Sequence, residues 1–216
     1  MRPSRPLRLN PNVPAISNWQ RTIKRAVDLF GSGLLLLVFS PVIALIALCI
    51  KAHDGGPVIY RRRVVGLNGE FDAFKLRSMC MDADDVLSGR PDLQAEYRQN
   101  FKLKNDPRIT PVGRVIRKFS LDELPQLVNV FRGDMSLVGP RMITPAELDK
   151  FNNVRWIFRQ VKPGMTGYWQ VYGRQEVSYA RRVEMELFYV EHWSLLLDFK
   201  ILLTTPLTVL RGAGAY

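Results

Sequence analysis

The longest apolar stretch lies near the start of the chain. Residues 29–50 carry no charged side chain and stand between Asp28 and Lys51. As one straight helix, this stretch would measure roughly 33 Å, close to the thickness of the hydrocarbon core of a bilayer. It shows no polar face, unlike most helices that pack on a soluble core. It also starts late, is long and lacks a following cleavage pattern, which argues against a cleaved signal peptide. The pattern therefore predicts a membrane-inserted helix.

The centre of this stretch contains Ser40-Pro41, where a proline removes a helical hydrogen bond and bends the helix. Both flanks are basic, since six Arg or Lys residues and no acid precede Asp28, and Lys51 and an arginine triplet at residues 61–63 follow. Basic flanks favour the cytoplasmic side of a membrane. We therefore expect a re-entrant helix that breaks at Ser40-Pro41 and returns, with a single-pass span as the alternative.

The alternation of apolar and polar residues after this stretch predicts two strands that flank a hairpin turn at Asn68-Gly69. Residues 82–101 have a helical pattern that is interrupted at residues 88–91. A further helix should begin near Leu121 or Glu123 and end before Arg132.

The C-terminal half begins with a clear helix start, because Thr144, Pro145 and Glu147 match the capping-box pattern. Residues 105–113 and 162–174 read as loops or extended segments. Residues 178–210 read as helical, with a possible break at Pro206. Within that region, residues 193–203 are apolar around nearly the whole helix, which fits a core helix or a helix in the membrane interface.

These elements give an α+β fold class that is mainly helical, with a small β-hairpin, a re-entrant membrane helix and interfacial helices. The expected divisions are a disordered basic tail over residues 1–18, the re-entrant helix over residues 19–51, and a cytoplasmic domain with membrane-interface helices over residues 52–216.

Composition narrows the choice of partners. The chain has 216 residues, a formal net charge of +11 and a sequence pI of about 10.0, so it should attract anions such as phosphorylated molecules, anionic lipids or nucleic acid. Two isolated cysteines, Cys49 and Cys80, fit a reducing compartment. The two histidines, His53 and His192, lack the spacing of metal ligands.

The segment KFSLDELPQL, residues 118–127, carries two adjacent carboxylates, Asp122 and Glu123. Ser120 and Glu123 could form a capping box, but Pro125 would then fall where a helical amide should donate. With Asp122 as the cap, Pro125 falls in the first turn and Glu123 has no capping role. The local pattern alone favours a helix start over a reactive site.

Basic residues elsewhere in the chain change that balance. Lys75 and Arg77 should share one face of the second strand, Arg117 precedes the carboxylates, and Arg141 follows a Gly-Pro pair. Arginine and lysine around two carboxylates suit a phosphorylated substrate. A carboxylate can attack phosphorus, while guanidinium groups and Mg²⁺ neutralise the phosphate oxygens.

Several ordered blocks together resemble the bacterial sugar transferases of the monotopic phosphoglycosyl transferase family, in their short catalytic-core form. These blocks are KRAVDLFGSGLLLLVFSPVIALIALCIK, FKLRSM, DPRITPVGRVIRKFSLDELPQLVNVFRGDMSLVGPR, KPGMTGYWQVYGR and YVEHWSLLLDFKILLTTPLTVLRGAGAY. The resemblance implies transfer of a sugar 1-phosphate from a UDP-sugar to undecaprenyl phosphate, with release of UMP. It implies Mg²⁺ as cofactor and a place on the cytoplasmic face of the bacterial inner membrane. The GAY ending resembles members that begin exopolysaccharide synthesis with glucose or galactose.

The resemblance also implies roles for the charged residues. Asp122 matches the nucleophile, which is also a metal ligand, and Glu123 matches its catalytic and metal-site companion. Arg117 matches a phosphate-binding arginine. Arg141 matches the arginine of a Gly-Pro-Arg-Pro segment, although this chain has Met142 where that proline is expected.

Lys75 and Arg77 match the basic pair that follows the hairpin in the family, so the implied phosphate and nucleotide ligands are Lys75, Arg77, Arg117 and Arg141. Two other classes of function remain as alternatives: a non-catalytic membrane scaffold, and a basic membrane-attached nucleic-acid-binding protein. The second lacks a recognisable reading module, so no nucleic-acid partner is expected. A homo-oligomer is compatible with the sequence.

The basic flanks generate a prediction of topology. Cysteines placed near residue 10 and near residue 68 should both resist a membrane-impermeant thiol reagent added to intact cells, because both flanks should lie in the cytoplasm. Clean labelling near residue 10 alone would instead indicate a single-pass span.

Overall fold

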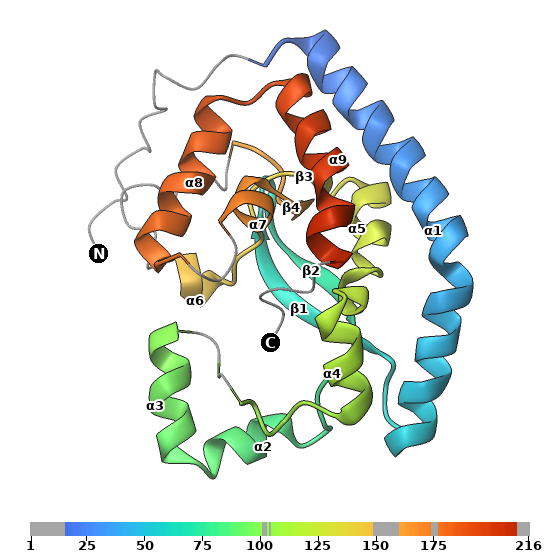
Figure 1. Ribbon diagram of the computed structural model, residues 1–216, viewed down its shortest axis with the longest axis vertical. Helices are drawn as coiled ribbons and strands as arrows, with labels where there is room; N and C mark the ends of the chain where they lie inside the picture. The colour runs from blue at the N-terminus through green and yellow to red at the C-terminus, as the bar shows by residue number, and fades with distance from the viewer. Residues whose placement is uncertain (1–15, 101–102, 104, 149–159, 174–176, 211–216) are drawn as a thin grey trace.

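The computed structural model describes residues 16–100, 103, 105–148, 160–173 and 177–210. It confirms a mainly helical fold with a small antiparallel hairpin (Figure 1). The described helices are α1 (Asn18–Asp54), α2 (Ala83–Ser88), α3 (Pro91–Asn100), α4 (Pro111–Lys118), the 3-10 turn η1 (Leu121–Glu123), α5 (Gln126–Arg132), α6 (Pro145–Leu148), α7 (Tyr168–Tyr172), α8 (Tyr179–Glu191) and α9 (Leu195–Leu210). The strands are β1 (Ile59–Gly66), β2 (Gly69–Leu76), β3 (Ser136–Val138) and β4 (Gly164–Thr166).

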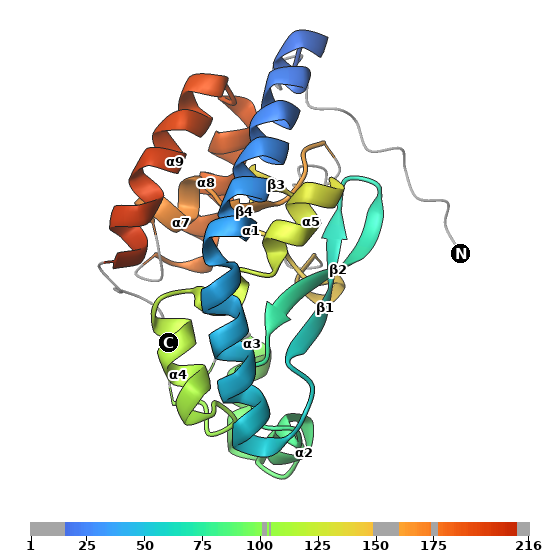
Figure 2. The same cartoon turned by 90° about the vertical axis from the view of Figure 1, so that its right-hand side faces the viewer.

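Helix α1 runs along one side of the molecule as one continuous helix of 37 residues (Figures 1 and 2). The helix is therefore not interrupted at Ser40-Pro41, where a break was expected. Pro41 cannot donate to the carbonyl of Leu37, but the Ser40 hydroxyl donates to that same carbonyl at 2.9 Å. The serine thus compensates the proline locally. The re-entrant path remains a prediction, as does the disordered tail, which lies almost wholly outside the described residues.

Only a narrow stripe of α1 packs on the rest of the protein, and its fully buried members are Asp28, Ser32, Ile46 and Ile50. The opposite side is apolar and exposed, with Phe30 at 80% exposure and Leu37 at 73%. Within the described part of the chain, α1 is the one helix whose length and hydropathy would let it cross a membrane.

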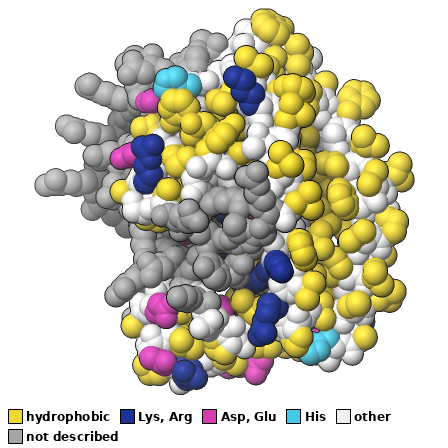
Figure 3. Space-filling model, viewed as in Figure 1, with side chains coloured by type: hydrophobic (Ala, Val, Ile, Leu, Met, Phe, Trp, Pro, Cys, Tyr) yellow, Lys and Arg dark blue, Asp and Glu magenta, His cyan; other side chains and the backbone are white. Residues whose placement is uncertain are grey.

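Helix α9 also exposes an apolar stripe, formed by Leu196, Phe199, Leu203, Leu207 and Leu210. These positions recur every three or four residues, as one side of a helix requires. We call the exposed hydrophobic side chains of α1 and α9 together the apolar face. Figure 3 shows hydrophobic side chains gathered over these two helices. A surface of this kind marks a site of membrane or protein contact rather than a water-exposed surface.

The helical region over residues 178–210 is divided at another place than expected. It breaks after α8, at residues 192–194, and α9 starts there because the Ser194 hydroxyl accepts a hydrogen bond from the Leu197 amide at 3.1 Å. Trp193 is buried at this corner, and its indole N–H donates to Asp198 at 3.2 Å. Pro206 remains inside α9, so the expected break at this proline is wrong.

The hairpin is confirmed, with its turn offset by one residue from the prediction. Gly66 pairs with Gly69, so Leu67 and Asn68 form the two-residue turn. Gly69 ends the turn with a φ of +119°, a conformation that glycine adopts without the penalty of a Cβ atom.

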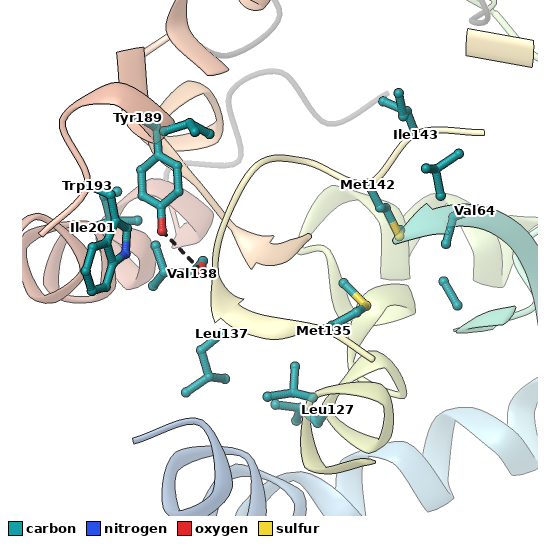
Figure 4. Packing of buried hydrophobic residues seen from close by; sticks show 14 residues of the cluster. Val64, Leu127, Met135, Leu137, Val138, Met142, Ile143, Tyr189, Trp193 and Ile201 are labelled. Atoms are coloured by element: carbon teal, nitrogen blue, oxygen red, sulfur yellow. Dashed lines mark hydrogen bonds between the residues drawn. The ribbon is translucent and has the colours of Figure 1, made fainter. Parts of the chain in front are cut away.

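The main core lies between the hairpin, α5, β3, α8 and α9. Figure 4 shows Val64, Leu127, Met135, Met142 and Tyr189 in this cluster. Burial of each large apolar side chain contributes about 1.5–3 kcal/mol. A second buried cluster of Ile46, Ile50, Leu76 and Ile116 joins α1 to β2 and α4. Strand β2 and helix α4 are thus packed directly on α1.

The sequence did not predict the parallel pair of β3 and β4, nor α4 and α7. The two strands approach closely because Gly164 begins β4 and Gly139 directly follows β3, and a Cβ on Gly164 would lie 2.1 Å from the Gly139 amide nitrogen. Helix α4 carries a start signal that could have been recognised. Thr110 caps it by accepting from the Gly113 amide at 2.9 Å, and Pro111 occupies the first turn, as at Thr144-Pro145.

The buried side chain of Asn129 generates a prediction about how α5 is fixed to β2. Its side-chain Oδ1 atom accepts a hydrogen bond from the Phe74 N–H at 3.0 Å, and its Nδ2 atom donates to the Asp72 carbonyl at 2.9 Å. Asn129→Ala should lower the free energy of unfolding by about 2 kcal/mol, because it leaves both groups without their partner. Chemical denaturation in detergent measures this. Asn105→Ala, at an exposed turn, should change the value by less than about 0.5 kcal/mol.

Candidate active site

The two carboxylates lie on η1, a single turn between α4 and α5. Ser120 precedes the turn with a φ of +54°, a left-handed conformation that is unusual for a residue other than glycine. Pro125 is the N-cap residue of α5, and neither Ser120 nor Pro125 makes a side-chain cap bond. Neither expected capping register is therefore present. Asp122 and Glu123 are not needed to start the helix and are available for other contacts.

Hydrophobic residues fix the turn from both sides. Leu121 packs against the cluster of Ile46, Ile50, Leu76 and Ile116, while Leu124 packs against the main core. Helices α4 and α5 on either side both contact α1. The carboxylates consequently lie on a rigid turn close to the membrane-type helix (Figure 1).

Glu123 is held by two cations. Its Oε1 atom accepts from Lys75 Nζ at 2.7 Å and from an Arg141 guanidinium nitrogen at 2.9 Å. Burial alone would raise the pKa of Glu123, but Arg141 and Lys75 reverse the effect and hold its pKa far below the usual range. Glu123 is therefore a fixed carboxylate that stays ionised wherever the protein is folded.

Asp122 has a contrasting environment. It is buried, with 8% exposure, and its carboxylate makes no hydrogen bond or ion pair with any residue that the structure describes. Burial raises the pKa of Asp122, against the opposing charge of Lys75 and, more weakly, of Arg117 and Arg141. Because these oxygens have no partner among the described residues, they suit a nucleophile better than a structural anchor.

Arg117 approaches the carboxylates from α4. Its Nε donates to the Ser78 hydroxyl at 2.8 Å, and the close packing of α4 on this segment requires Gly113, since a Cβ there would lie 1.9 Å from the Ser78 carbonyl oxygen. Burial lowers the pKa of Arg117, and the charge of Asp122 opposes this. Within the described ranges, no carboxylate forms an ion pair with Arg117. The outer guanidinium nitrogens can therefore bind an anionic ligand.

Arg77 does not join this group, although it was expected to. Its guanidinium forms an ion pair with Asp54, at the end of α1, and donates to the Pro57 carbonyl at 2.6 Å. The reason is that β2 ends at Leu76, so the alternation that places Lys75 in the site does not extend to Arg77. Arg77 instead anchors the connection between α1 and β1.

Arg141 enters the site from the segment after β3, where its backbone N–H donates to Glu186 Oε1 at 3.1 Å. Met142, which replaces the expected proline, is buried in the main core (Figure 4). The next residue, Ile143, accepts from the Val65 amide at 2.9 Å. Core packing and a backbone hydrogen bond therefore fix this segment without a second proline.

Sequence reasoning missed Ser78, which holds Arg117, and Glu186, which holds Arg141. Glu186 and Arg182 have the spacing of an ion pair on one side of a helix, but that spacing is common on exposed helices. Only the fold shows that Glu186 is buried beside the site.

The donor set fits a Mg²⁺ ion that binds together with substrate. The described residues contain no cluster of three or more potential ligands from His, Cys, Asp and Glu. Mg²⁺ is commonly bound by one or two carboxylates together with substrate phosphates and water. Asp122 and Glu123 can provide the carboxylates.

An apolar groove of about 200 Å³ lies between α1, β3 and α9, away from the carboxylates. It opens onto the apolar face and is lined mainly by Val27, Leu137, Leu195, Phe199 and Leu202, with Lys24 and Asp198 among its polar residues.

Comparison with known proteins gives consistent matches. The model of the family described as "Bacterial sugar transferase" matches residues 19–212. The chain is 47% identical to the undecaprenyl-phosphate galactose phosphotransferase of Salmonella typhimurium, over 97% of this chain and 44% of that protein. It is 44% identical to the exopolysaccharide production protein ExoY of Rhizobium meliloti, over 89% of this chain and 88% of that protein.

A third relative is the UDP-glucose:undecaprenyl-phosphate glucose-1-phosphate transferase of Escherichia coli, which is 39% identical over 91% of this chain and 41% of that protein. The chain thus spans less than half the length of the Salmonella and Escherichia proteins, and nearly nine tenths of the Rhizobium protein.

The placement of Arg117 generates a prediction that distinguishes the shape of its guanidinium group from its positive charge. Arg117→Lys should reduce release of UMP from a UDP-sugar on the order of tenfold or more, because an ammonium group cannot bond to Ser78 and also present two nitrogens to a phosphate. Arg114→Lys, an exposed change on the same helix, is the matched control and should leave the rate unchanged. Near-normal release by Arg117→Lys would mean that this residue contributes only positive charge.

Proposed function

The chain belongs to the bacterial sugar transferase family, and from this membership we propose that it transfers a sugar 1-phosphate from a UDP-sugar to undecaprenyl phosphate, releasing UMP. The names of the Salmonella and Escherichia relatives, which include undecaprenyl phosphate, support this reaction. The observation that carries the proposal is the buried carboxylate of Asp122, which has no partner among the described residues, beside Glu123, which is held by Lys75 and Arg141.

In the first half of the reaction, an Asp122 oxygen attacks the phosphorus next to the sugar. A new bond forms between this oxygen and phosphorus, and the bond between phosphorus and the bridging oxygen breaks, so that UMP leaves with the electron pair. The free guanidinium nitrogens of Arg117 are suited to bind the phosphate oxygens during this step. A bound Mg²⁺ would supply further neutralisation of the phosphate charge.

In the second half, an oxygen of undecaprenyl phosphate attacks the same phosphorus and displaces Asp122. The product is a lipid-linked diphosphate sugar, and the aspartate is restored. Glu123 stays ionised and fixed by two cations throughout, so it orients Lys75 and Arg141 toward the phosphate rather than reacting itself. This assigns nucleophilic attack to Asp122 and a supporting role to Glu123.

The apolar face supports a reaction on a membrane lipid, because the acceptor carries its phosphate on a chain that is insoluble in water. The turn with Asp122 lies between two helices that contact α1, which supports a position of the carboxylate close to the membrane. We place the protein on the cytoplasmic side of the bacterial inner membrane, with α1 re-entrant. The relatives' names favour galactose or glucose as the sugar and exopolysaccharide synthesis as the pathway.

The mechanism predicts a covalent intermediate. UDP-sugar labelled in the phosphate next to the sugar, mixed with protein and Mg²⁺ but no lipid, should leave label on the protein and release UMP. The label should disappear when undecaprenyl phosphate is added, because the lipid phosphate displaces the aspartate. Gel autoradiography and UMP release measure the two halves separately.

Asp122→Asn should give no labelled protein and reduce the complete reaction by several orders of magnitude, since an amide is a poor nucleophile. Asp134→Asn, which removes a carboxylate after α5, is a control that should label normally. Undiminished transfer by Asp122→Asn would favour a direct attack by the lipid, and a complete lack of transfer by the unaltered protein would favour a scaffold.

A further inference from the structure

A further carboxylate lies beside the site, on α8. Glu186 is 1% exposed, and its Oε1 atom accepts the backbone N–H of Arg141 at 3.1 Å. Its other oxygen, Oε2, is buried without a hydrogen-bond partner among the described residues. A buried carboxylate oxygen without a partner is costly, so its presence calls for a role other than stability.

The nearest cation on the same helix is Arg182, which is also incompletely paired. Its guanidinium lies 4.6 Å from the ring centroid of Trp169, and its Nε atom is buried without a hydrogen bond to a described residue. Among the carboxylates that the structure describes, Glu147 lies within ion-pair distance of Arg182, at 3.9 Å. On the exposed side of the same helix, Arg181 and Glu184 form an ordinary pair at 2.8 Å, with both side chains 63% exposed.

Glu186 is connected to the reacting groups through one residue. Arg141 donates its backbone N–H to Glu186 and a guanidinium N–H to Glu123 at 2.9 Å. A shift of the backbone at Arg141 would therefore move the guanidinium that contacts Glu123. Glu186 thus holds the backbone of Arg141, while Glu123 holds its guanidinium.

We propose that Glu186 is a positioning residue for the transferase reaction: its ionised carboxylate holds Arg141 against Glu123, and binding of the UDP-sugar depends on that ionisation. This role rests on the proposed function. It requires no contact between Glu186 and the substrate.

The surroundings of Glu186 allow it to titrate near neutral pH. Burial raises the pKa of Glu186 to about 7, against the opposing effects of the Arg182 charge, the Arg141 N–H and the Arg141 charge. The charged and titratable groups around it are Arg182, Tyr179 and Tyr189 on α8, Arg141 after β3, and Glu147 of α6, which lies beyond Arg182. An ionised carboxylate accepts a hydrogen bond from an N–H group more strongly than a neutral one. Binding of the UDP-sugar should therefore improve as pH rises through about 7.

The test compares Glu186→Gln with the matched control Glu184→Gln, which makes the same change on the exposed side of α8. The measurement is kcat/KM for UMP release from UDP-sugar between pH 6 and pH 8. The unaltered protein and Glu184→Gln should both rise by about tenfold across this range, as the ionised fraction of a group with this pKa does. Glu186→Gln should stay flat across this range, below the value that the unaltered protein has at pH 6, with the loss at pH 8 mainly in KM.

Thermal unfolding over the same pH range distinguishes a positioning role of Glu186 from a failure of the Glu186→Gln protein to fold. Because the pKa of Glu186 is raised in the folded protein, its contribution to stability is complete below the unfolded value of 4.5 and is lost as pH rises through about 7. Glu186→Gln should therefore remain folded and lack this part of the decrease in Tm with pH, while Glu184→Gln should keep it.

Each outcome gives a decision. A tenfold rise that persists in Glu186→Gln, or that vanishes equally in Glu184→Gln, overturns the role of Glu186 and leaves the proposed function intact. A Glu186→Gln protein that loses activity equally at every pH, with an unchanged dependence of Tm on pH, also overturns it. Absence of UMP release by the unaltered protein at every pH overturns the proposed function and this role together.

Discussion

The ionic contact of Glu123 with Lys75 and Arg141 is the interaction on which the site depends. It joins segments that lie 48 and 18 residues from Glu123 in the sequence, and brings β2, η1 and the segment after β3 to one carboxylate oxygen. Such a contact contributes little net stability, since burying the charges costs about as much as their attraction returns. Its main effect is geometric. It fixes two cations beside Asp122 while leaving the Asp122 carboxylate without a partner among the described residues.

The same segments are also tied to α1, which connects the site to the membrane. Lys24 donates to the Val138 carbonyl at 2.9 Å and Asp28 accepts from the Leu137 amide at 2.8 Å, so α1 holds β3 by its backbone. Strand β3 leads directly through Gly139 and Pro140 to Arg141. The depth of α1 in a bilayer would therefore set the depth of the phosphate-binding cations. This arrangement suits an enzyme whose acceptor phosphate lies at a fixed level near the lipid headgroups.

Local patterns predicted the parts of the fold that local forces determine. The hairpin and the Thr144 capping box are stabilised within a few residues, and both were found from sequence. The sequence did not reveal the β3–β4 pair, because each strand has three residues and their pairing joins Ser136 to Gly164. Arg77 was misplaced because nothing local marks the end of β2. Glu186 was missed because its burial depends on how α8 packs, which the spacing on one helix does not encode.

The two adjacent carboxylates show how one turn can place similar chemical groups in different surroundings. Consecutive side chains on a helical turn point in different directions. Glu123 therefore faces the cations of β2 and the segment after β3, whereas the buried Asp122 has no hydrogen-bond partner among the described residues. Leaving a buried carboxylate unbonded is unfavourable for the free protein. In the mechanism that we propose, a phosphate that arrives with its own neutralising cations removes that penalty, so the interaction is strongest when the reacting phosphorus is present. The cost in the resting state would then make Asp122, rather than Glu123, the group prepared to react.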